Sequence, residues 1–160
     1  MNESLKYENS NNLSTAIDSE MDRYENQITD YVAGLKYEDL TEEAVETAKE
    51  RYVDSFATAL AAYDTAPVKA MRKLALQSYS ETGATLLGSH HKAPIDYATV
   101  YLGTMIRALD WNDTYLNREP AHPSDNLAAC LAVAEAEERN GKDLILEFSK
   151  IFKENFWLDE

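Results

Sequence analysis

Hydrophobic residues recur at spacings of three and four along most of the chain, which is the pattern of amphipathic helices. The pattern predicts helices over residues 19–34, 42–63, 67–82, 94–109, 124–139 and 143–156. Residues 84–88 are apolar and end in glycine, which predicts a small extended segment before a polar loop at 89–92. We therefore predict an all-α fold of about six helices, with a disordered tail at residues 1–18 and a partial helical domain at 19–160.

Two of the predicted helices have well-defined apolar faces. In the helix over 42–63, which Thr41 is expected to cap, the face comprises Val45, Ala48, Tyr52, Val53, Phe56 and Leu60. In the helix over 94–109 it comprises Tyr97, Tyr101, Leu102, Met105, Ile106 and Leu109. Three small residues on the latter helix would let another helix approach closely: Ala98, Gly103 and Ala108.

The charge balance narrows the choice of partner. The chain has 29 acidic and 15 basic side chains, for a net charge of −14 at pH 7. Such a chain repels nucleic acid and anionic membranes, so neither is expected as a partner. The single cysteine, Cys130, excludes a disulfide within the chain and a cysteine-built metal site. The sequence has no apolar run of about 18 residues and no signal-peptide core, so we predict a cytoplasmic protein.

The segment at residues 110–114 places two acids, Asp110 and Asp113, at the end of a predicted helix. The helix dipole is negative there and disfavours a carboxylate by about 0.3–1 kcal/mol. Arg107, Arg118 or a bound proton would offset that cost, and an acid in such a place is a candidate for a raised pKa and for proton exchange. The alternative is a solvated loop acid, or an Asx turn that ends the helix.

A histidine, His122, stands just before another predicted helix N-terminus, in the order His122, Pro123, Ser124, Asp125. Free backbone N–H groups at such a terminus form a site for a carboxylate, and an imidazole beside it can act as a general acid or base. The alternative is an ordinary surface histidine beside a Ser124 or Asp125 helix cap.

The remaining candidates predict no further chemistry. Adjacent side chains of an extended segment point to opposite sides, so we do not expect His90 and His91 to chelate a metal together. No carboxylate or thiol stands near them at ligand spacing, and we expect no metal site. Cys130 falls near the apolar face of a helix, which favours a core position over a nucleophile.

The segment GTMIRALDWNDTYL at residues 103–116, followed by EPAHPSDNL at 119–127, resembles the MmgE/PrpD family. Asn112 and the long interval to His-Pro-Ser-Asp-Asn resemble the dehydratase branch, and the likeness covers about residues 20–148. The resemblance implies a lyase that dehydrates 2-methylcitrate, a small tricarboxylate of propionate catabolism, with no metal or organic cofactor. It also implies a homodimer whose subunits have a large helical and a smaller α/β domain.

On this resemblance, three residues match positions assigned to the active site: Asp110, Thr114 and His122. We expect His122 to transfer protons, Asp110 to orient it or share the proton, and Thr114 to hydrogen-bond a substrate oxygen. Substrate contacts are also expected from four neighbours: Arg107, Asn112, Asp113 and Ser124. Lys92 and Arg107 are the nearest cations in sequence for the substrate carboxylates. Which group is base and which is acid stays open.

Members of the family are much longer than this chain, and the likeness fades after Phe148. A second active-site histidine and the lysines that would hold carboxylates are expected beyond residue 160. We therefore expect an N-terminal fragment, inactive alone, with a separately encoded C-terminal part as its possible complement. Two alternatives stay open: a non-catalytic helical remnant or interaction module, and a related decarboxylase or epimerase.

Overall fold

A computed structural model of the chain describes residue 23 and residues 25–116 and 120–154. The chain divides into two compact units, Met1–Leu35 and Lys36–Glu160. In the first unit, residue 23 and residues 25–34 are helical, and the helix ends at Gly34 as predicted. The tail predicted at residues 1–18 lies outside the described residues, so the division at residue 18 stays a prediction.

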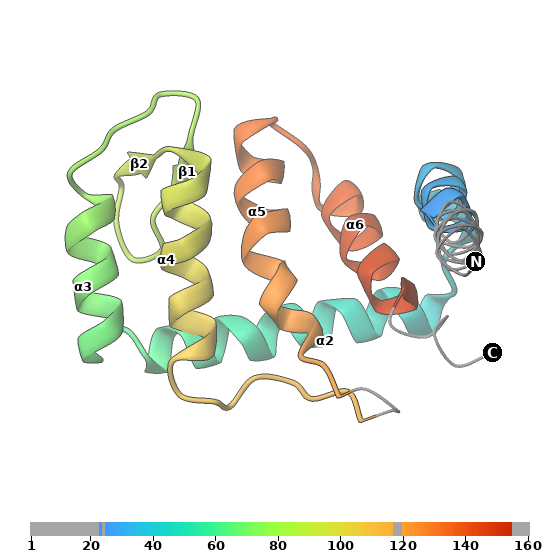
Figure 1. The fold of residues 1–160 in the computed structure, drawn as a ribbon, viewed down its shortest axis with the longest axis horizontal. Coiled ribbons are helices and arrows are strands. Elements are labelled where there is room, and N and C mark those ends of the chain that lie inside the picture. The colour runs from blue at the N-terminus through green and yellow to red at the C-terminus, as the bar shows by residue number, and fades with distance from the viewer. Residues whose placement is uncertain (1–22, 24, 117–119, 155–160) are drawn as a thin grey trace, which may run out of the picture. The chain divides into compact units, whose positions relative to one another are not determined.

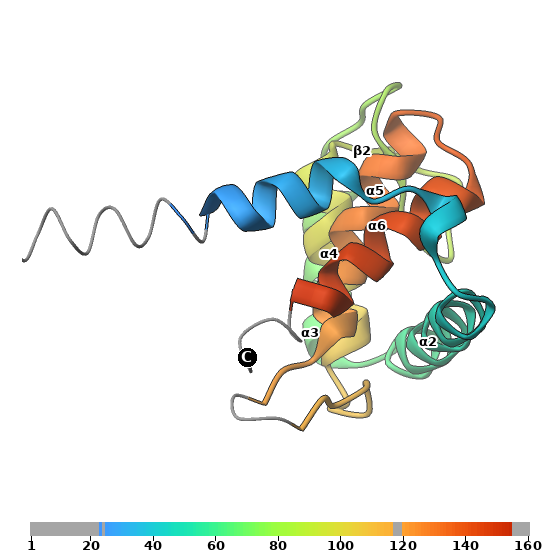
Figure 2. The ribbon, with the colours of Figure 1, turned by 90° about the vertical axis from the view of Figure 1, so that its right-hand side faces the viewer.

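The second unit contains five α-helices, two short 3₁₀ helices and one small hairpin. The helices are α2 (Glu42–Ala61), α3 (Ala66–Ala75), α4 (Ile95–Arg107), α5 (Leu127–Ala136) and α6 (Gly141–Glu154), with 3₁₀ helices η1 (Tyr37–Asp39) and η2 (Pro123–Asn126). The strands are β1 (Ala84–Thr85) and β2 (Lys92–Ala93). Within this unit α3, α4, α5 and α6 stand in a row and α2 runs across their ends (Figures 1 and 2). With the first helix, the described residues form six α-helices, which confirms the predicted fold class.

The beginnings and ends of α2 and α3 test the sequence prediction directly. Thr41 caps α2 as predicted, because its side-chain oxygen accepts a hydrogen bond from the backbone N–H of Ala44 at 3.1 Å. The predicted extension of α3 to residue 82 is wrong, since the helix ends at Ala75. The reason is tertiary: the chain must turn back toward the hairpin, where Ser80 N–H donates to the carbonyl of Lys92 at 3.2 Å.

The core lies around α4, whose predicted apolar face is confirmed. Its buried residues are Ala98, Tyr101, Leu102, Met105 and Ile106. A Cβ placed on Gly103 would lie 3.7 Å from that of Ala128, so this small residue brings α4 and α5 into close contact. None of the described helices is long and apolar enough to cross a membrane.

The predicted face of α2 is wrong in part. Val53 and Leu60 are 70% and 56% exposed. Ala48 and Tyr52 of the predicted face are buried, and three small residues are buried beside them: Ser55, Thr58 and Ala59. Tyr52 anchors this orientation: its ring lies 5.0 Å from that of Phe148, and its hydroxyl donates to the carbonyl of Leu144 at 3.3 Å.

The extended segment predicted at residues 84–88 is confirmed only in part, because the strand is limited to Ala84–Thr85. This strand has a partner that the sequence did not predict. β1 pairs antiparallel with β2, Ala84 opposite Ala93. Gly83 is required beside this pair, because a Cβ there would lie 1.9 Å from the carbonyl oxygen of Ala93. The loop between the strands contains both His90, which is exposed, and His91, which is partly buried.

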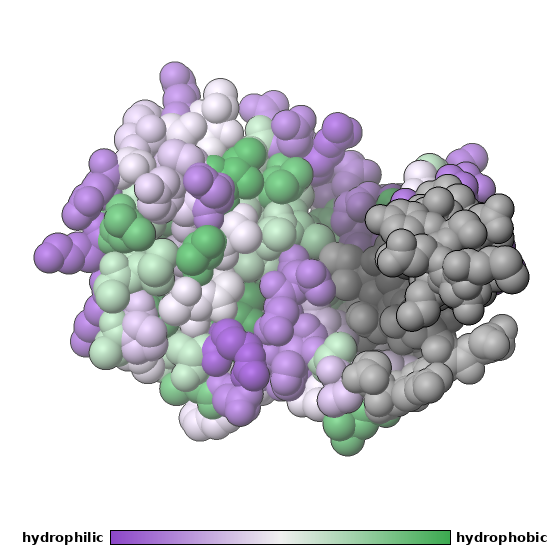
Figure 3. Space-filling view, viewed as in Figure 1, coloured by the Kyte–Doolittle hydropathy of each residue, from purple (hydrophilic) through white to green (hydrophobic). Residues whose placement is uncertain are grey.

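The outer surface of the row of helices is mixed in character. Hydrophobic side chains emerge among hydrophilic ones over α3, α4 and α5 (Figure 3). Leu74, Val100 and Val133 belong to these helices and are 43%, 51% and 48% exposed.

Candidate active site

Most of the predicted site residues lie on the long loop that joins the end of α4 to η2 and α5 (Figure 1), while Arg107 ends α4 and Ser124 belongs to η2. Tyr115 and Ala121 form an isolated antiparallel bridge across it, with N–H···O distances of 2.8 and 3.0 Å. The bridge brings residues 110–114 beside residues 122–126. It is the reason why Thr114 and His122, eight positions apart, are neighbours in space.

Asp110 is held at the beginning of the loop by Arg107, the last residue of α4. Its backbone has φ 56°, a left-handed conformation that aspartate tolerates better than most residues. The Arg107 guanidinium donates to the Asp110 carboxylate, and this hydrogen bond lowers the pKa of Asp110 below its ordinary value. Arg107 is thus one of the groups expected to offset the helix dipole. Of the two interpretations of Asp110, a raised pKa is wrong, and a solvated loop acid fits its 75% exposed side chain. Arg118 lies outside the described residues.

Asn112 ties the loop to η2 from the inside. It is 7% exposed, and its amide nitrogen donates to Ser124 Oγ at 3.1 Å and to Asp125 Oδ1 at 3.2 Å. Its amide oxygen accepts a hydrogen bond from Arg107 Nη1 at 3.3 Å. Asn112 therefore connects the end of α4 to η2 within a single side chain.

Asp113 makes two contacts that bracket His122. Its backbone carbonyl lies 2.7 Å from His122 Nδ1, and its carboxylate oxygen Oδ1 accepts the backbone N–H of Ser124 at 3.0 Å. The side chain is 8% exposed, and its second oxygen, Oδ2, is buried with no hydrogen-bond partner in the structure as described. A buried acceptor left unpaired costs about 1–3 kcal/mol.

The carboxylate site expected at the helix N-terminus is already occupied. Pro123 has no N–H, and the next donor, that of Ser124, is bonded to Asp113. The predicted cap at Ser124 or Asp125 is wrong as well, because the N-cap of α5 is Asn126 and makes no side-chain cap bond. The reason is that η2 intervenes, and both side chains accept from Asn112 instead.

His122 and Thr114 form the more accessible edge of the site. Thr114 is exposed, His122 is partly buried, and Thr114 Oγ1 lies 3.4 Å from His122 Nδ1. Nε2 of His122 has no hydrogen-bond partner among the described residues. The arrangement offers a proton-transferring imidazole, a hydroxyl and a guanidinium that is 43% exposed.

The structure separates some of the predicted residues and leaves one role untested. Lys92, on β2, and Arg107 lie at opposite ends of α4, whose 13 residues span about 20 Å. Lys92 therefore cannot share a substrate with Arg107 in this arrangement. Asn112, Asp113 and Ser124 form hydrogen bonds within the loop, and their substrate contacts stay a prediction. The described residues contain no group of His, Cys, Asp or Glu able to hold a metal ion.

The sequence did not predict the Tyr115–Ala121 bridge or the hydrogen bond that the Asp113 carboxylate accepts from the backbone N–H of Ser124. One signal for the second was available. Pro123 removes the first N–H of the turn and leaves that of Ser124 as its first donor, so an acid or amide nearby is the natural partner. The Tyr115–Ala121 bridge could not be predicted from the sequence, because it pairs two short segments of an irregular loop that show no strand pattern.

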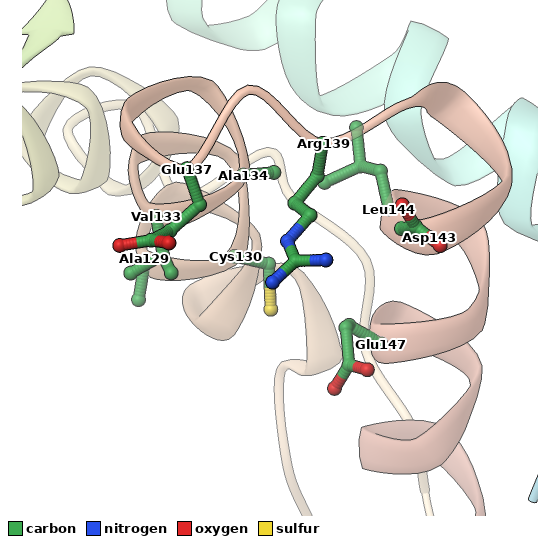
Figure 4. A pocket seen from close by; sticks show the side chains of 9 residues that line it. All are labelled: Ala129, Cys130, Val133, Ala134, Glu137, Arg139, Asp143, Leu144 and Glu147. Atoms are coloured by element: carbon green, nitrogen blue, oxygen red, sulfur yellow. The ribbon is translucent and has the colours of Figure 1, made fainter.

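A separate hollow of about 680 Å³ lies between α5 and α6, and no predicted site residue lines it. Its wall includes Cys130, Val133 and Leu144, and Arg139 extends into it (Figure 4). Burial, and then the charge of Glu147, raises the pKa of the Cys130 thiol. Cys130 is partly exposed rather than fully in the core, but it is not activated as a nucleophile.

The second unit is all-α apart from one small hairpin, and a polar loop joins two of its core helices, α4 and α5. Residues 26–150 match the MmgE/PrpD N-terminal domain, and the chain belongs to the MmgE/PrpD family. The match includes the whole of the loop that carries Asp110, Thr114 and His122.

Three relatives sharpen this placement. The 2-methylcitrate dehydratase of Salmonella typhimurium is 34% identical over 122 residues, which are 76% of this chain and 25% of that protein. The 2-methylcitrate dehydratase of Cupriavidus necator is 35% identical over 114 residues, 71% of this chain and 23% of the relative. The mitochondrial 2-methylcitrate dehydratase of Yarrowia lipolytica is 54% identical over 41 residues, 26% of this chain and 8% of the relative. The chain thus spans about a quarter of the length of the first two relatives.

Proposed function

We propose that this chain supplies part of the active site of an enzyme that dehydrates 2-methylcitrate or a closely related tricarboxylate. One observation carries the proposal: a single loop brings Thr114 within 3.4 Å of His122, next to the Arg107–Asp110 pair. The relatives described above support the substrate, because each is a 2-methylcitrate dehydratase.

In this reaction a base removes a proton from the carbon beside a carboxylate. A carbon–carbon double bond forms, the carbon–oxygen bond on the neighbouring carbon breaks, and the hydroxyl leaves as water after it is protonated. His122 is the proton-transfer group in this proposal, and Thr114 hydrogen-bonds a substrate oxygen. The low pKa of Asp110 favours its role as a fixed negative charge that orients its neighbours over that of a proton carrier.

The same geometry supports the proposal that the chain does not turn over substrate alone. A tricarboxylate needs several cations, and in the loop as described Arg107 is already paired with Asp110 and bonded to Asn112. The missing cations would come from the remainder of the enzyme, whether in the same polypeptide or in a separately encoded C-terminal part. A homodimer, the absence of a cofactor and a cytoplasmic location also stay predictions.

The test uses the isolated chain and a chimera in which residues 26–150 replace the matching segment of the Salmonella relative. Each is incubated with 2-methylcitrate, and absorbance of the unsaturated product is followed. We expect turnover by the chimera and none by the isolated chain.

A folded chimera without turnover would contradict the proposal and favour a helical remnant or interaction module. Turnover of a different acid, with loss of carbon dioxide or inversion at carbon, would favour a decarboxylase or epimerase. Turnover by the isolated chain that His122→Ala abolishes would show that no remainder is needed.

A further inference from the structure

The hydrogen bonds around His122 decide which of its two ring nitrogens is free to exchange a proton. The carbonyl oxygen of Asp113 can only accept, and it lies 2.7 Å from Nδ1. Nδ1 must therefore carry a hydrogen whenever this contact is made. In the neutral ring Nε2 then has the lone pair, and a proton that arrives or leaves does so at Nε2.

We propose that Asp113 is a positioning residue that fixes His122 as its Nδ1–H tautomer and so makes Nε2 the atom that transfers protons. The tautomer follows from the contacts alone. The role of Nε2 in dehydration rests on the proposed function.

The side chain of Asp113 adds a second tether to the two segments that the Tyr115–Ala121 bridge brings together. Its Oδ1 accepts a hydrogen bond from the N–H of Ser124, two residues after His122. Asp113 therefore contacts both the His122 ring, through its carbonyl, and the backbone that follows His122. Asn112 reinforces this by bonding Ser124 Oγ and Asp125 Oδ1. Without these tethers, residues 122–126 are free to move away from the Asp113 carbonyl, and the ring can take either tautomer.

Oδ2 of Asp113 explains why a conservative variant is informative. This oxygen has no partner in the described structure, so exchange for an amide nitrogen breaks no existing hydrogen bond. Asp113→Asn keeps an oxygen that can accept from Ser124, whereas Asp113→Ala removes it. The two variants therefore separate the tether from the rest of the side chain.

The chain contains its own control. His91 lies 2.7 Å from the carbonyl of Ser78 through Nε2, so the same reasoning fixes it as the opposite, Nε2–H tautomer. This contact lies near the hairpin, in another part of the second unit. His90 is exposed and serves as the unconstrained reference.

The experiment measures long-range ¹H–¹⁵N correlations of the three imidazole rings in the full chain, at a pH well above the ordinary imidazole range. Each signal is assigned by substituting one histidine at a time with Gln. We expect protonated Nδ1 in His122, protonated Nε2 in His91 and a mixture in His90. Asp113→Ala should turn His122 into a mixture and leave His91 unchanged, while Asp113→Asn should preserve both.

A mixture or an Nε2–H form of His122 in the unchanged chain would overturn the inference, and so would an unaltered His122 tautomer in folded Asp113→Ala. If Asp113→Ala unfolds, His91 loses its signature as well. Amide exchange of Ser124 in the unchanged chain then decides: slow exchange, retained in Asp113→Asn, supports the tether, and fast exchange refutes it. None of these readouts depends on turnover, so an inactive chimera would count against the proposed function only.

Discussion

His91 and His122 lie in two loops of the same unit, and each ring is bonded to a backbone carbonyl at 2.7 Å. His91 uses Nε2, rests edge-on against Tyr79 with ring centroids 5.8 Å apart, and ties the hairpin to the segment after α3. His122 uses Nδ1 and leaves Nε2 without a partner among the described residues. The two hydrogen bonds are similar in length but involve different ring nitrogens. The nitrogen that is bonded to the carbonyl determines which nitrogen can transfer a proton.

The neighbours of the two histidines also differ. The backbone of His91 is held within the hairpin loop, since its N–H donates to Ser89 Oγ and its carbonyl accepts from the N–H of Leu86. His122 is next to the Thr114 hydroxyl and near the Arg107–Asp110 pair. A histidine that closes a turn and a histidine that faces reactive groups are therefore distinguishable by their neighbours.

The largest expected effect would come from removing each ring in the active chimera. His122→Ala should lower kcat by about 10²–10⁴-fold, the usual cost of losing a general acid or base. His91→Ala should leave kcat close to that of the parent chimera. Steady-state turnover of 2-methylcitrate by the purified variants checks this. Equal losses of kcat in both variants would contradict the assignment of proton transfer to His122 rather than His91.

A smaller effect is expected on stability. In the unchanged chain background, His91→Ala should lower the free energy of unfolding by about 1–2 kcal/mol, because the carbonyl of Ser78 loses its donor. The neighbouring exposed residue gives the control: His90→Ala should stay within about 0.5 kcal/mol of the parent. Urea denaturation followed by circular dichroism measures both, and a cost at His90 equal to that at His91 would show that the contact with Ser78 contributes little.

The smallest effect concerns pH and the ion pair beside His122. Because the pKa of Asp110 is lowered in the folded chain, its contribution to stability is present above the ordinary aspartate range. That contribution is lost as the pH falls through the lowered value. Thermal unfolding of the chain and of Asp110→Asn should therefore differ slightly near neutral pH and converge in acid. A difference that grows in acid would mean that the pair does not hold Asp110 in its charged form.

Helical periodicity predicted the fold well where burial is one-sided, as in α4, whose five buried residues all lie on or beside the expected face. It failed in α2 because small residues can face a core as readily as large ones. Ser55 and Thr58 are buried there, while Val53 and Leu60 point outward. Hydrophobicity alone does not record such a choice, since it depends on how closely the neighbouring helix approaches.

The sequence predicted which residues form the candidate site but not how they contact one another. Asp110, Thr114 and His122 were named from a motif, and the structure brings Thr114 to His122. The contacts of Asp113 with His122 and Ser124 span nine and eleven positions across an irregular loop, where no periodic rule relates one residue to another. The same limit explains the error over the pKa of Asp110: the dipole of α4 was visible in the sequence, whereas the hydrogen bond from Arg107 required coordinates.

The backbone at Asp110 has a consequence for how this loop can change by mutation. Its side chain is 75% exposed, which by itself would mark a position open to almost any replacement. The left-handed φ of 56° narrows the choice to residues such as Asn and Gly. Both are reached from an aspartate codon by a single-base change, and both discard the negative charge. The substitutions that the backbone tolerates best are thus the ones that remove the ion pair with Arg107.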